Sequence, residues 1–297
     1  MFESPSIKPK TCFFSLRDFS AIGDVCRYLR QHLSEVREKE NYVMQYVPRP
    51  WPSERELEVL VGQSEGLFIY VSTLVSFISD KHGRPQDKLR AVMTTHRGLD
   101  PLYDQVLSEA RKFDYFGRVV GTIIYLHQPL ILSELEQFLQ LPLSCIHLAL
   151  WGCQPIFSIL LTDDESVQPF HASLRDFLTE HYRAKSHFLD PKIHHVLITV
   201  DCLKSVARYV DHGANGAHVK YACQKWCYHF SLALLGQGTF DNEMVILMGR
   251  MEKQWLKFWM HNLDNFDVVK EIVVDCETAL TEIKDVVCLT VLTALRH

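Results

Sequence analysis

The sequence predicts a mainly α-helical protein, with three short helices and a β-hairpin near its middle and further helices on both sides. Two observations lead to this fold class. Apolar residues recur at steps of three and four through most of the chain, which is the spacing of a buried helix face. Two β-prone segments joined by a polar turn lie between residues 157 and 170. With 297 residues, the chain has room for two or three domains.

The composition is that of a globular protein with no preference for polyanions. Hydrophobic residues make up 47% and charged residues 23% of the chain, and the net charge is −5, which gives no basic footprint for nucleic acid or an anionic membrane. The longest apolar run, residues 66–78, is too short to span a bilayer, and the N-terminus lacks a signal peptide's apolar core. Nine cysteines without regular pairing indicate reduced thiols. We therefore expect a cytoplasmic protein with no membrane or nucleic-acid partner.

The first helical domain is predicted over residues 20–111, after a β-prone segment at Thr11–Leu16. Ser53 and Glu56 have the spacing of a capping box, in which each side chain satisfies the other residue's backbone N–H. The predicted apolar side of the first helix consists of Ile22, Val25, Cys26, Leu29 and Leu33.

Gly66 separates the capping-box helix from the segment Leu67–Ile78, which is apolar nearly all round and therefore predicts a buried helix. A helical turn follows at Leu89–Met93. A further helix begins near Leu99, with Asp100 as its predicted cap and Pro101 in its first turn.

The middle of the chain, residues 112–185, predicts the element order of a winged helix. A second pair with capping-box spacing, Ser133 and Glu136, marks the start of its second helix. We interpret the acidic segment Asp163–Glu165 as a solvated hairpin tip and not as a pair of acid–base carboxylates. The helices are predicted at Phe113–His127, Ser133–Leu139 and Ser144–Trp151, and the strands at Phe157–Leu161 and Val167–Phe170.

A histidine lies directly before the helix that follows the hairpin. Leu174, Phe177 and Leu178 form one apolar face of this helix, and Ser173 is its predicted N-cap. His171 then lies where free N–H groups and the helix dipole favour negative charge, so a neutral imidazole could donate one more hydrogen bond to a phosphate. The alternative is a structural histidine that caps the helix or closes the strand.

A second helical domain is predicted over residues 186–297, with a glycine-containing linker at Asp211–Gly216. Its helices are predicted at Pro191–Val210, Val219–Leu235, Asn242–Phe258 and Val268–Leu295.

Six blocks of this sequence resemble successive blocks of fungal NACHT-domain proteins, which are STAND-class (signal-transducing) NTPases related to NOD-like immune receptors. The resemblance covers roughly residues 10–265, in matching order and spacing. The blocks are Gly66-Leu67-Phe68-Ile69-Tyr70, Leu99-Asp100-x-Leu102-Tyr103, Val120-Gly121-Thr122-Ile123-Ile124, His171-x-Ser173-Leu174-Arg175-Asp176-Phe177-Leu178, Asp190-Pro191-x-x-His194-His195 and Tyr221-Ala222-Cys223-x-x-Trp226-x-x-His229.

The resemblance implies a P-loop nucleotide-binding domain followed by a small helical domain, a winged helix and a second helical domain. Residues 1–19 would be a remnant of the last strand of the nucleotide-binding domain. Residues 20–111 would be the small helical domain, 112–185 the winged-helix domain and 186–297 the second helical domain. We expect the chain to be a shortened paralogue, or a sequence separated from its upstream coding region.

The resemblance also implies roles for individual residues. His171 matches the winged-helix histidine that contacts the β-phosphate of bound ADP and holds the inactive state. Gly66, Leu67 and Phe68 fall where relatives have Gly-Leu-Pro on the adenine side of the nucleotide, and Phe68 here replaces that proline.

One departure from the family concerns the phosphate-binding loop. No Gly-x-x-x-x-Gly-Lys-Ser/Thr motif occurs in the sequence, so this chain lacks the backbone cradle and the lysine that hold the phosphates. We therefore expect no catalytic residue and no hydrolysis by this chain on its own. ADP or ATP is expected as a cofactor only together with an upstream P-loop domain.

The predicted function is a regulatory and relay segment of a NACHT-type STAND protein, which couples nucleotide state to protein–protein interaction. The expected partners are protein domains, either its own upstream nucleotide-binding domain or that of a paralogue, and an oligomer is compatible with this function. The alternatives are a helical scaffold with no nucleotide dependence and a winged-helix DNA-binding regulator. DNA binding is disfavoured because the third helix, Ser144–Trp151, has no Lys or Arg and is interpreted as buried.

Potential metal ligands are also present in the sequence but have poor spacing. His194 and His195 with Cys202 could suggest a metal site, yet adjacent histidines on a helix point about a hundred degrees apart. Cys223 and Cys227 lack a second pair at zinc-finger spacing. We expect no metal, and we interpret the two histidines as part of a polar helix face.

Overall fold

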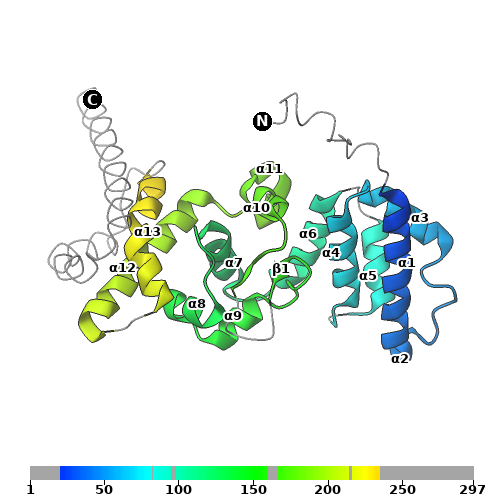
Figure 1. Ribbon diagram of the computed structural model, residues 1–297, viewed down its shortest axis with the longest axis horizontal. Coiled ribbons are helices and arrows are strands. Elements are labelled where there is room, and N and C mark those ends of the chain that lie inside the picture. The colour runs from blue at the N-terminus through cyan, green and yellow to red at the C-terminus, as the bar shows by residue number, and fades with distance from the viewer. Residues whose placement is uncertain (1–20, 82, 95–97, 160–165, 214–215, 235–297) are drawn as a thin grey trace, which may run out of the picture. The chain divides into compact units, whose positions relative to one another are not determined.

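The computed structural model describes residues 21–81, 83–94, 98–159, 166–213 and 216–234 (Figure 1). This part of the chain is mainly helical, as predicted. The chain divides into two compact units, Met1–Gln105 and Val106–His297, which are considered separately below. The predicted strand at Thr11–Leu16 and the predicted helices Asn242–Phe258 and Val268–Leu295 lie outside the described residues.

Unit 1 is a bundle in which α1 packs against α3 and α4, and α5 packs against α3 and α4. Its core contains Leu33 of α1, Leu60 of α3, Leu74 of α4 and Leu89 of α5, each at most 1% exposed. The helices are α1 (Ile22–Lys39), α2 (Asn41–Met44), α3 (Glu54–Ser64), α4 (Phe68–Ser79) and α5 (Pro85–Met93), and α6 (Leu99–Ala110) runs across the boundary between the units.

Helix α3 begins as its sequence predicts. The Ser53 hydroxyl accepts a hydrogen bond from the Glu56 backbone N–H at 3.3 Å, and the Glu56 carboxylate accepts one from the Ser53 N–H at 2.7 Å. This reciprocal pair satisfies two backbone donors that would otherwise have no partner at the helix start.

Other details of unit 1 differ from the prediction. Ile22, on the predicted apolar side of α1, is 56% exposed. Helix α4 is not buried all round, because Phe68 at its start and Ser72 one turn later are exposed. Helix α5 begins at Pro85 and not near Leu89, since proline fits the first turn of a helix. Asp100 is the second residue of α6 and does not precede it.

The C-terminal end of α4 is closed by a lysine from the next helix. The Lys88 ammonium donates hydrogen bonds to the backbone carbonyls of Phe77, at 2.8 Å, and Asp80, at 2.7 Å. It also lies 5.1 Å from the centre of the Phe77 ring and 3.4 Å from an Asp80 carboxylate oxygen. A buried ammonium is tolerated here because carbonyls at a helix C-terminus lack partners and attract positive charge.

Unit 2 contains the predicted order of three helices followed by a hairpin, and then further helices. The two strands pair antiparallel, with Phe157 opposite Pro169 and Ser158 opposite Gln168. Its elements after α6 are α7 (Phe116–Tyr125), α8 (Leu132–Leu139), α9 (Leu143–Ala149), β1 (Phe157–Ser158), β2 (Gln168–Pro169), α10 (Ala172–Thr179), α11 (His181–Ala184), a 3-10 turn (Lys185–His187), α12 (Pro191–His212) and α13 (Ala217–Leu234).

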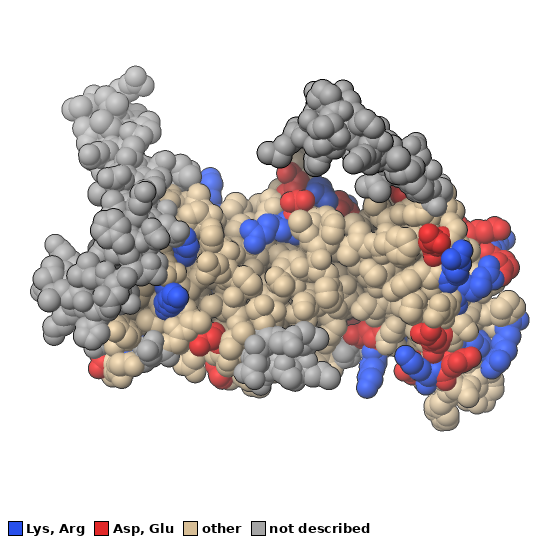
Figure 2. All heavy atoms as spheres, in the orientation of Figure 1, with Lys and Arg blue, Asp and Glu red and all other residues tan. Residues whose placement is uncertain are grey.

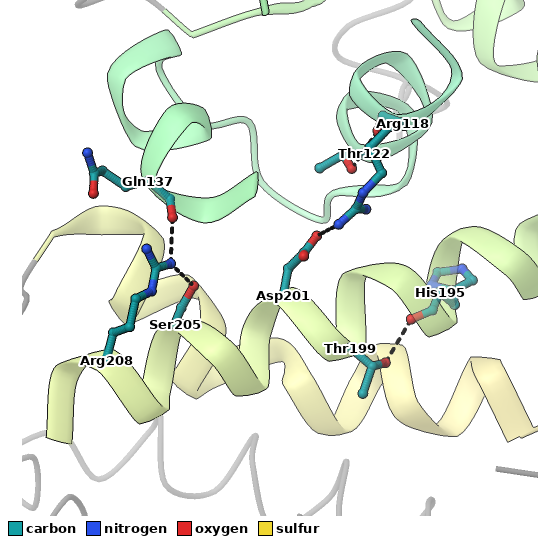
Figure 3. Close-up of polar contacts among 8 residues, drawn as sticks. All are labelled: Arg118, Thr122, Gln137, His195, Thr199, Asp201, Ser205 and Arg208. Atoms are coloured by element: carbon teal, nitrogen blue, oxygen red, sulfur yellow. Dashed lines mark hydrogen bonds and ion pairs between the residues drawn. The ribbon is translucent and has the colours of Figure 1, made fainter. Parts of the chain in front are cut away.

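Helices α12 and α13 form an antiparallel pair that packs against α7 and α8. The turn between them begins at Gly213, whose φ of +69° is a conformation that glycine adopts without strain. At the start of α13, the His218 backbone N–H donates to the Glu134 carboxylate of α8 at 2.8 Å, and the His218 ring contacts the same carboxylate. The contacts of His218 with Glu134 therefore join this pair to α8, and the ion pair of Arg118 in α7 with Asp201 in α12 joins it to α7 (Figure 3).

The predictions for α8 and α9 are wrong in one detail each. Helix α9 is not buried, because His147 and Leu148 are exposed and Trp151, just beyond its end, is 46% exposed. Ser133 does not cap α8, because the helix already begins at Leu132 and its N-cap residue is Ile131. Among the described helices, none combines the length and the hydrophobicity that crossing a membrane requires.

Candidate functional site

His171 is the N-cap residue of α10 and follows strand β2 after one residue. Its backbone is extended, with φ −146° and ψ 142°, and its Nδ1 atom accepts a hydrogen bond from the Ser173 backbone N–H at 3.2 Å. The Ser173 hydroxyl lies 2.7 Å from the same Nδ1. The prediction that Ser173 caps this helix is wrong, because Ser173 is already helical and only the residue before the helix has the extended backbone that a cap requires.

The cap geometry determines the tautomer of the neutral His171 ring. Because Nδ1 accepts a backbone N–H, the single ring proton of the neutral form must reside on Nε2. The side chain is exposed, and Nε2 has no hydrogen-bond partner within the described part of the chain. An Nε2–H donor is therefore presented to solvent at the N-terminus of an eight-residue helix.

Three buried residues hold α10 in place beneath this donor. Leu174, Phe177 and Leu178 are each at most 1% exposed, as the spacing of apolar residues predicts. The opposite side of α10 is in solvent, where Arg175 and Asp176 are exposed. The imidazole therefore sits on a helix anchored in a packed unit and not on a loop.

The second predicted contact set, Gly66-Leu67-Phe68, belongs to unit 1. Gly66 has a φ of +76°, and Leu67 is the N-cap of α4. The Leu67 and Phe68 side chains are 45% and 46% exposed. The Phe68 ring lies edge-on to Tyr28 of α1, with 6.2 Å between ring centres. The segment thus presents a half-exposed aromatic ring and belongs to unit 1, whereas His171 belongs to unit 2.

A cluster of buried histidines in unit 2 is the feature that the sequence analysis missed. His194 and His195 of α12 are each 7% exposed, and His229 of α13 is fully buried. The interpretation of the first two as a polar helix face is therefore wrong. The spacing of His195 with the fully buried Ile198 and Cys202, three and seven residues later, is a core periodicity that could have revealed it.

Hydrogen bonds link this cluster in a chain. The His127 backbone N–H donates to the Tyr221 hydroxyl at 2.9 Å. That hydroxyl lies 2.7 Å from Nε2 of His229, and Nδ1 of His229 lies 2.8 Å from Nδ1 of His195. The chain connects the end of α7 with α13 and α12.

The third histidine contacts α7 directly. The His194 ring stacks on Tyr125, with 5.6 Å between ring centres and 16° between ring planes. It also lies against Gly121, where a Cβ atom would be only 1.9 Å from His194 Cε1. The imidazole thus occupies the space that the missing glycine side chain leaves.

Burial lowers the pKa of all three imidazoles. It lowers the pKa of His194 and of His195 to about 4, and neighbouring cations add to the effect: Arg118 for His194 and Arg175 for His195. The pKa of His229 falls well below its ordinary value, again mainly because of burial. All three are therefore neutral at pH 7. Within the described residues, no group of three or more His, Cys, Asp or Glu side chains could hold a metal ion.

The charged residues on the face drawn in Figure 2 are of both signs. Lys and Arg alternate with Asp and Glu over the helices of unit 1, and they do not merge into one basic area on that face. Helix α9, the third of the three helices before the hairpin, has no Lys or Arg. A phosphate-backbone surface needs several cations together, so neither observation favours a nucleic-acid partner.

Comparisons with models of known protein families, with curated proteins and with solved structures found no significant match to this chain.

Proposed function

We propose that this chain is the regulatory and relay segment of a nucleotide-controlled switch of the NACHT-type STAND class. In this proposal His171 donates a hydrogen bond from Nε2 to the β-phosphate of ADP held by a separate P-loop domain. The observation that carries the proposal is the cap geometry of His171, which leaves one N–H donor exposed at a helix N-terminus. The helix dipole adds to the attraction for an anion at that position.

The order of elements around His171 supports the winged-helix part of the proposal. Helices α7, α8 and α9 are followed by the β1–β2 ladder, and His171 lies directly beyond β2. We accordingly propose residues 112–185 as a winged-helix domain, with residues 20–111 and 186–297 as the helical domains before and after it.

We propose Leu67 and Phe68 as the adenine-side contact of the same switch. Both are nearly half exposed, and an aromatic ring can stack on a purine. Phe68 would then replace the proline of relatives with a larger contact area. Gly66, in a left-handed conformation before them, turns the chain into α4.

The proposed activity is protein–protein interaction controlled by nucleotide and not catalysis. The sequence has no Gly-x-x-x-x-Gly-Lys-Ser/Thr motif, so the P-loop, and ADP or ATP with it, would come from an upstream domain or a paralogue. With ADP bound, the contact through His171 would favour the closed state. Exchange for ATP would release the helical segments as rigid bodies, because a ligand shifts such an equilibrium only through its different contacts in the two states.

The test is calorimetric titration of ADP and ATP into the chain, alone and joined to any P-loop domain encoded upstream of it. Loss of a hydrogen bond to a charged group costs roughly 1.5–3 kcal/mol, so His171→Ala should weaken ADP binding about tenfold to a hundredfold. The matched control is His181→Ala, which removes another exposed histidine of unit 2. Equal ADP affinity for His171→Ala and the unaltered protein would remove the phosphate role.

A helical scaffold with no nucleotide dependence is the second candidate. It is favoured by Tyr42 of α2 and Tyr46 just after that helix, which are 86% and 89% exposed. Exposed aromatic residues of this kind are typical of protein contact surfaces. If the joined protein bound neither ADP nor ATP, this candidate would replace the first.

A further inference from the structure

The buried histidine chain of unit 2 has a property that the proposed switch does not use. We propose that the contact among α7, α12 and α13 is an acid-sensitive latch, which is closed when His194, His195 and His229 are neutral and opens when they are protonated. The proposal rests on the hydrogen-bond geometry of the chain and on the charges that surround it, and it is independent of nucleotide binding.

One assignment of protons satisfies all three hydrogen bonds of the chain. The Tyr221 hydroxyl accepts the His127 N–H and donates its own proton to Nε2 of His229. Nδ1 of His229 then carries a hydrogen and donates it to Nδ1 of His195, 2.8 Å away. Each ring holds one proton in this arrangement, so both are neutral.

An added proton costs the chain a hydrogen bond. If His195 gains a proton on Nδ1, two N–H groups face each other at 2.8 Å. If Nε2 of His229 is protonated instead, the Tyr221 hydroxyl no longer has an acceptor for its own proton. Buried polar groups without partners are costly, and a buried charge is more costly still. The imidazoles can therefore be protonated only when water reaches them. This requires α12 and α13 to separate from each other or from α7.

The groups around the rings are mostly cations or neutral. They are Arg118 and Tyr125 of α7, His127 after it, Arg175 of α10, Asp190 before α12, and Tyr221, Lys225 and Tyr228 of α13. Asp190 favours a charged ring only at His194, whereas Arg118, Arg175 and Lys225 each oppose a charged ring. Burial is the main reason that the three imidazoles stay neutral, and this arrangement of charges adds to it.

The sign of the pH effect follows from these shifts. A histidine whose folded pKa lies below its ordinary value stabilises the folded state at neutral pH, and that stability is lost as pH falls from about 6.5 toward about 4. Asp201 acts in the opposite direction, because burial raises the pKa of its carboxyl to about 6 and it takes up a proton on acidification. Three imidazoles outweigh this one carboxyl, so acid opens the latch.

The test compares unfolding in urea at pH 7.5 and pH 5.0 for the full chain and for His229→Gln, whose amide keeps a donor and an acceptor but does not titrate. A histidine whose pKa is near 6.5 in the unfolded chain and well below 5 in the folded chain raises the unfolding constant by up to about 30-fold between these pH values. The acid response of His229→Gln should be smaller by up to that factor, because burial holds the pKa of His229 well below its ordinary value. His212→Gln, which removes an exposed histidine of α12, is the matched control and should respond like the unaltered chain.

Two further measurements keep the proposal testable if His229→Gln folds poorly. Nitrogen-15 NMR of the unaltered chain at pH 7 should show the proton on Nδ1 of His229 and on Nε2 of His195. Hydrogen exchange, corrected for the intrinsic rate, should rise in α7, α12 and α13 at pH 5.0 but not in α1, α3 and α4. Protonation of His195 or His229 near pH 6.5 in the folded chain, or an equal acid response in His229→Gln, would overturn the latch.

Discussion

A single residue, Gly121, allows α7 and α12 to approach each other closely, because the His194 ring of α12 lies directly against it. Its position in α7 has no space for a side chain, because a Cβ would lie 1.9 Å from Cε1 and 2.2 Å from Nδ1 of His194. The His194 ring cannot move away freely, since it is buried and stacked on Tyr125. A glycine in the middle of a helix lowers stability on its own. Residue 121 is glycine because the His194 ring occupies the space that any side chain would need.

Gly121→Ala should therefore destabilise the protein by about 1–3 kcal/mol through overpacking. Gly117→Ala is the control in the same helix, where a Cβ meets nothing within 4 Å. It should be neutral or stabilise by up to about 1 kcal/mol, because alanine favours the helix. Urea unfolding of the two variants decides the matter: similar free energies of unfolding would contradict the proposed packing of His194 on Gly121.

At the scale of the element, two sequence pairs with identical capping-box spacing behave differently. Ser53 and Glu56 form the box and start α3, whereas Ser133 lies inside α8 and makes no cap hydrogen bond. The difference arises because Ile131 pairs with Ser166 in an isolated β-bridge and is extended, so α8 begins directly after it. Glu136 instead accepts a hydrogen bond from the backbone N–H of Leu143, at the start of α9.

Ser53→Ala should cost about 1 kcal/mol of stability, the usual loss when a capping hydroxyl is removed. Ser133→Ala should stay within about 0.5 kcal/mol of the unaltered protein, because the hydroxyl caps nothing and alanine has the higher helix propensity. Thermal unfolding of both variants measures the difference. Equal losses would mean that the local sequence pattern, and not the actual helix start, determines capping here.

At the scale of the whole molecule, polar contacts between distant segments help to join the helices of unit 2 (Figure 3). The Arg118 guanidinium of α7 pairs with the Asp201 carboxylate of α12, 83 residues later, and Asp201 is 3% exposed. Arg208, one turn from Ser205, donates to the Gln137 carbonyl in α8. A buried pair of this kind adds little net stability, but the loss of one partner leaves an uncompensated charge.

Arg118→Met should therefore cost about 3 kcal/mol at pH 8, and Arg118→Met/Asp201→Leu should recover most of the loss. The single variant's loss should shrink at pH 5.5. Burial already raises the pKa of Asp201 to about 6, and removal of Arg118 raises it further, so acid neutralises the unpaired carboxyl. Urea unfolding of both variants at the two pH values is the measurement. A loss independent of pH would show that Asp201 is not the cause.

The periodicity of apolar residues predicted most of the described helices, and their ends were less well predicted. Leu174, Phe177 and Leu178 face the core as their spacing indicates, and the strand pairing of Phe157 with Pro169 lies inside the predicted hairpin. The position of His171 before a helix is predicted correctly. The structure makes His171 itself the cap, which is the alternative role predicted for it from the sequence, and the prediction of Ser173 as the cap is wrong. The residue that caps a helix is the last one with an extended backbone before the helix begins. Strand β2, which precedes α10, determines that this residue is His171.

The sequence by itself determined the mainly helical class, the start of α3 and the placement of His171 next to a helix N-terminus. These follow from hydrogen bonds and apolar spacing within a few residues. Only the tertiary structure decided that His195 contacts His229, that α9 has an exposed side and that His171 directs Nε2 to solvent. The physical reason is separation along the sequence. His195 and His229 are 34 residues apart in the chain, and they come into contact only after α12 and α13 have packed together.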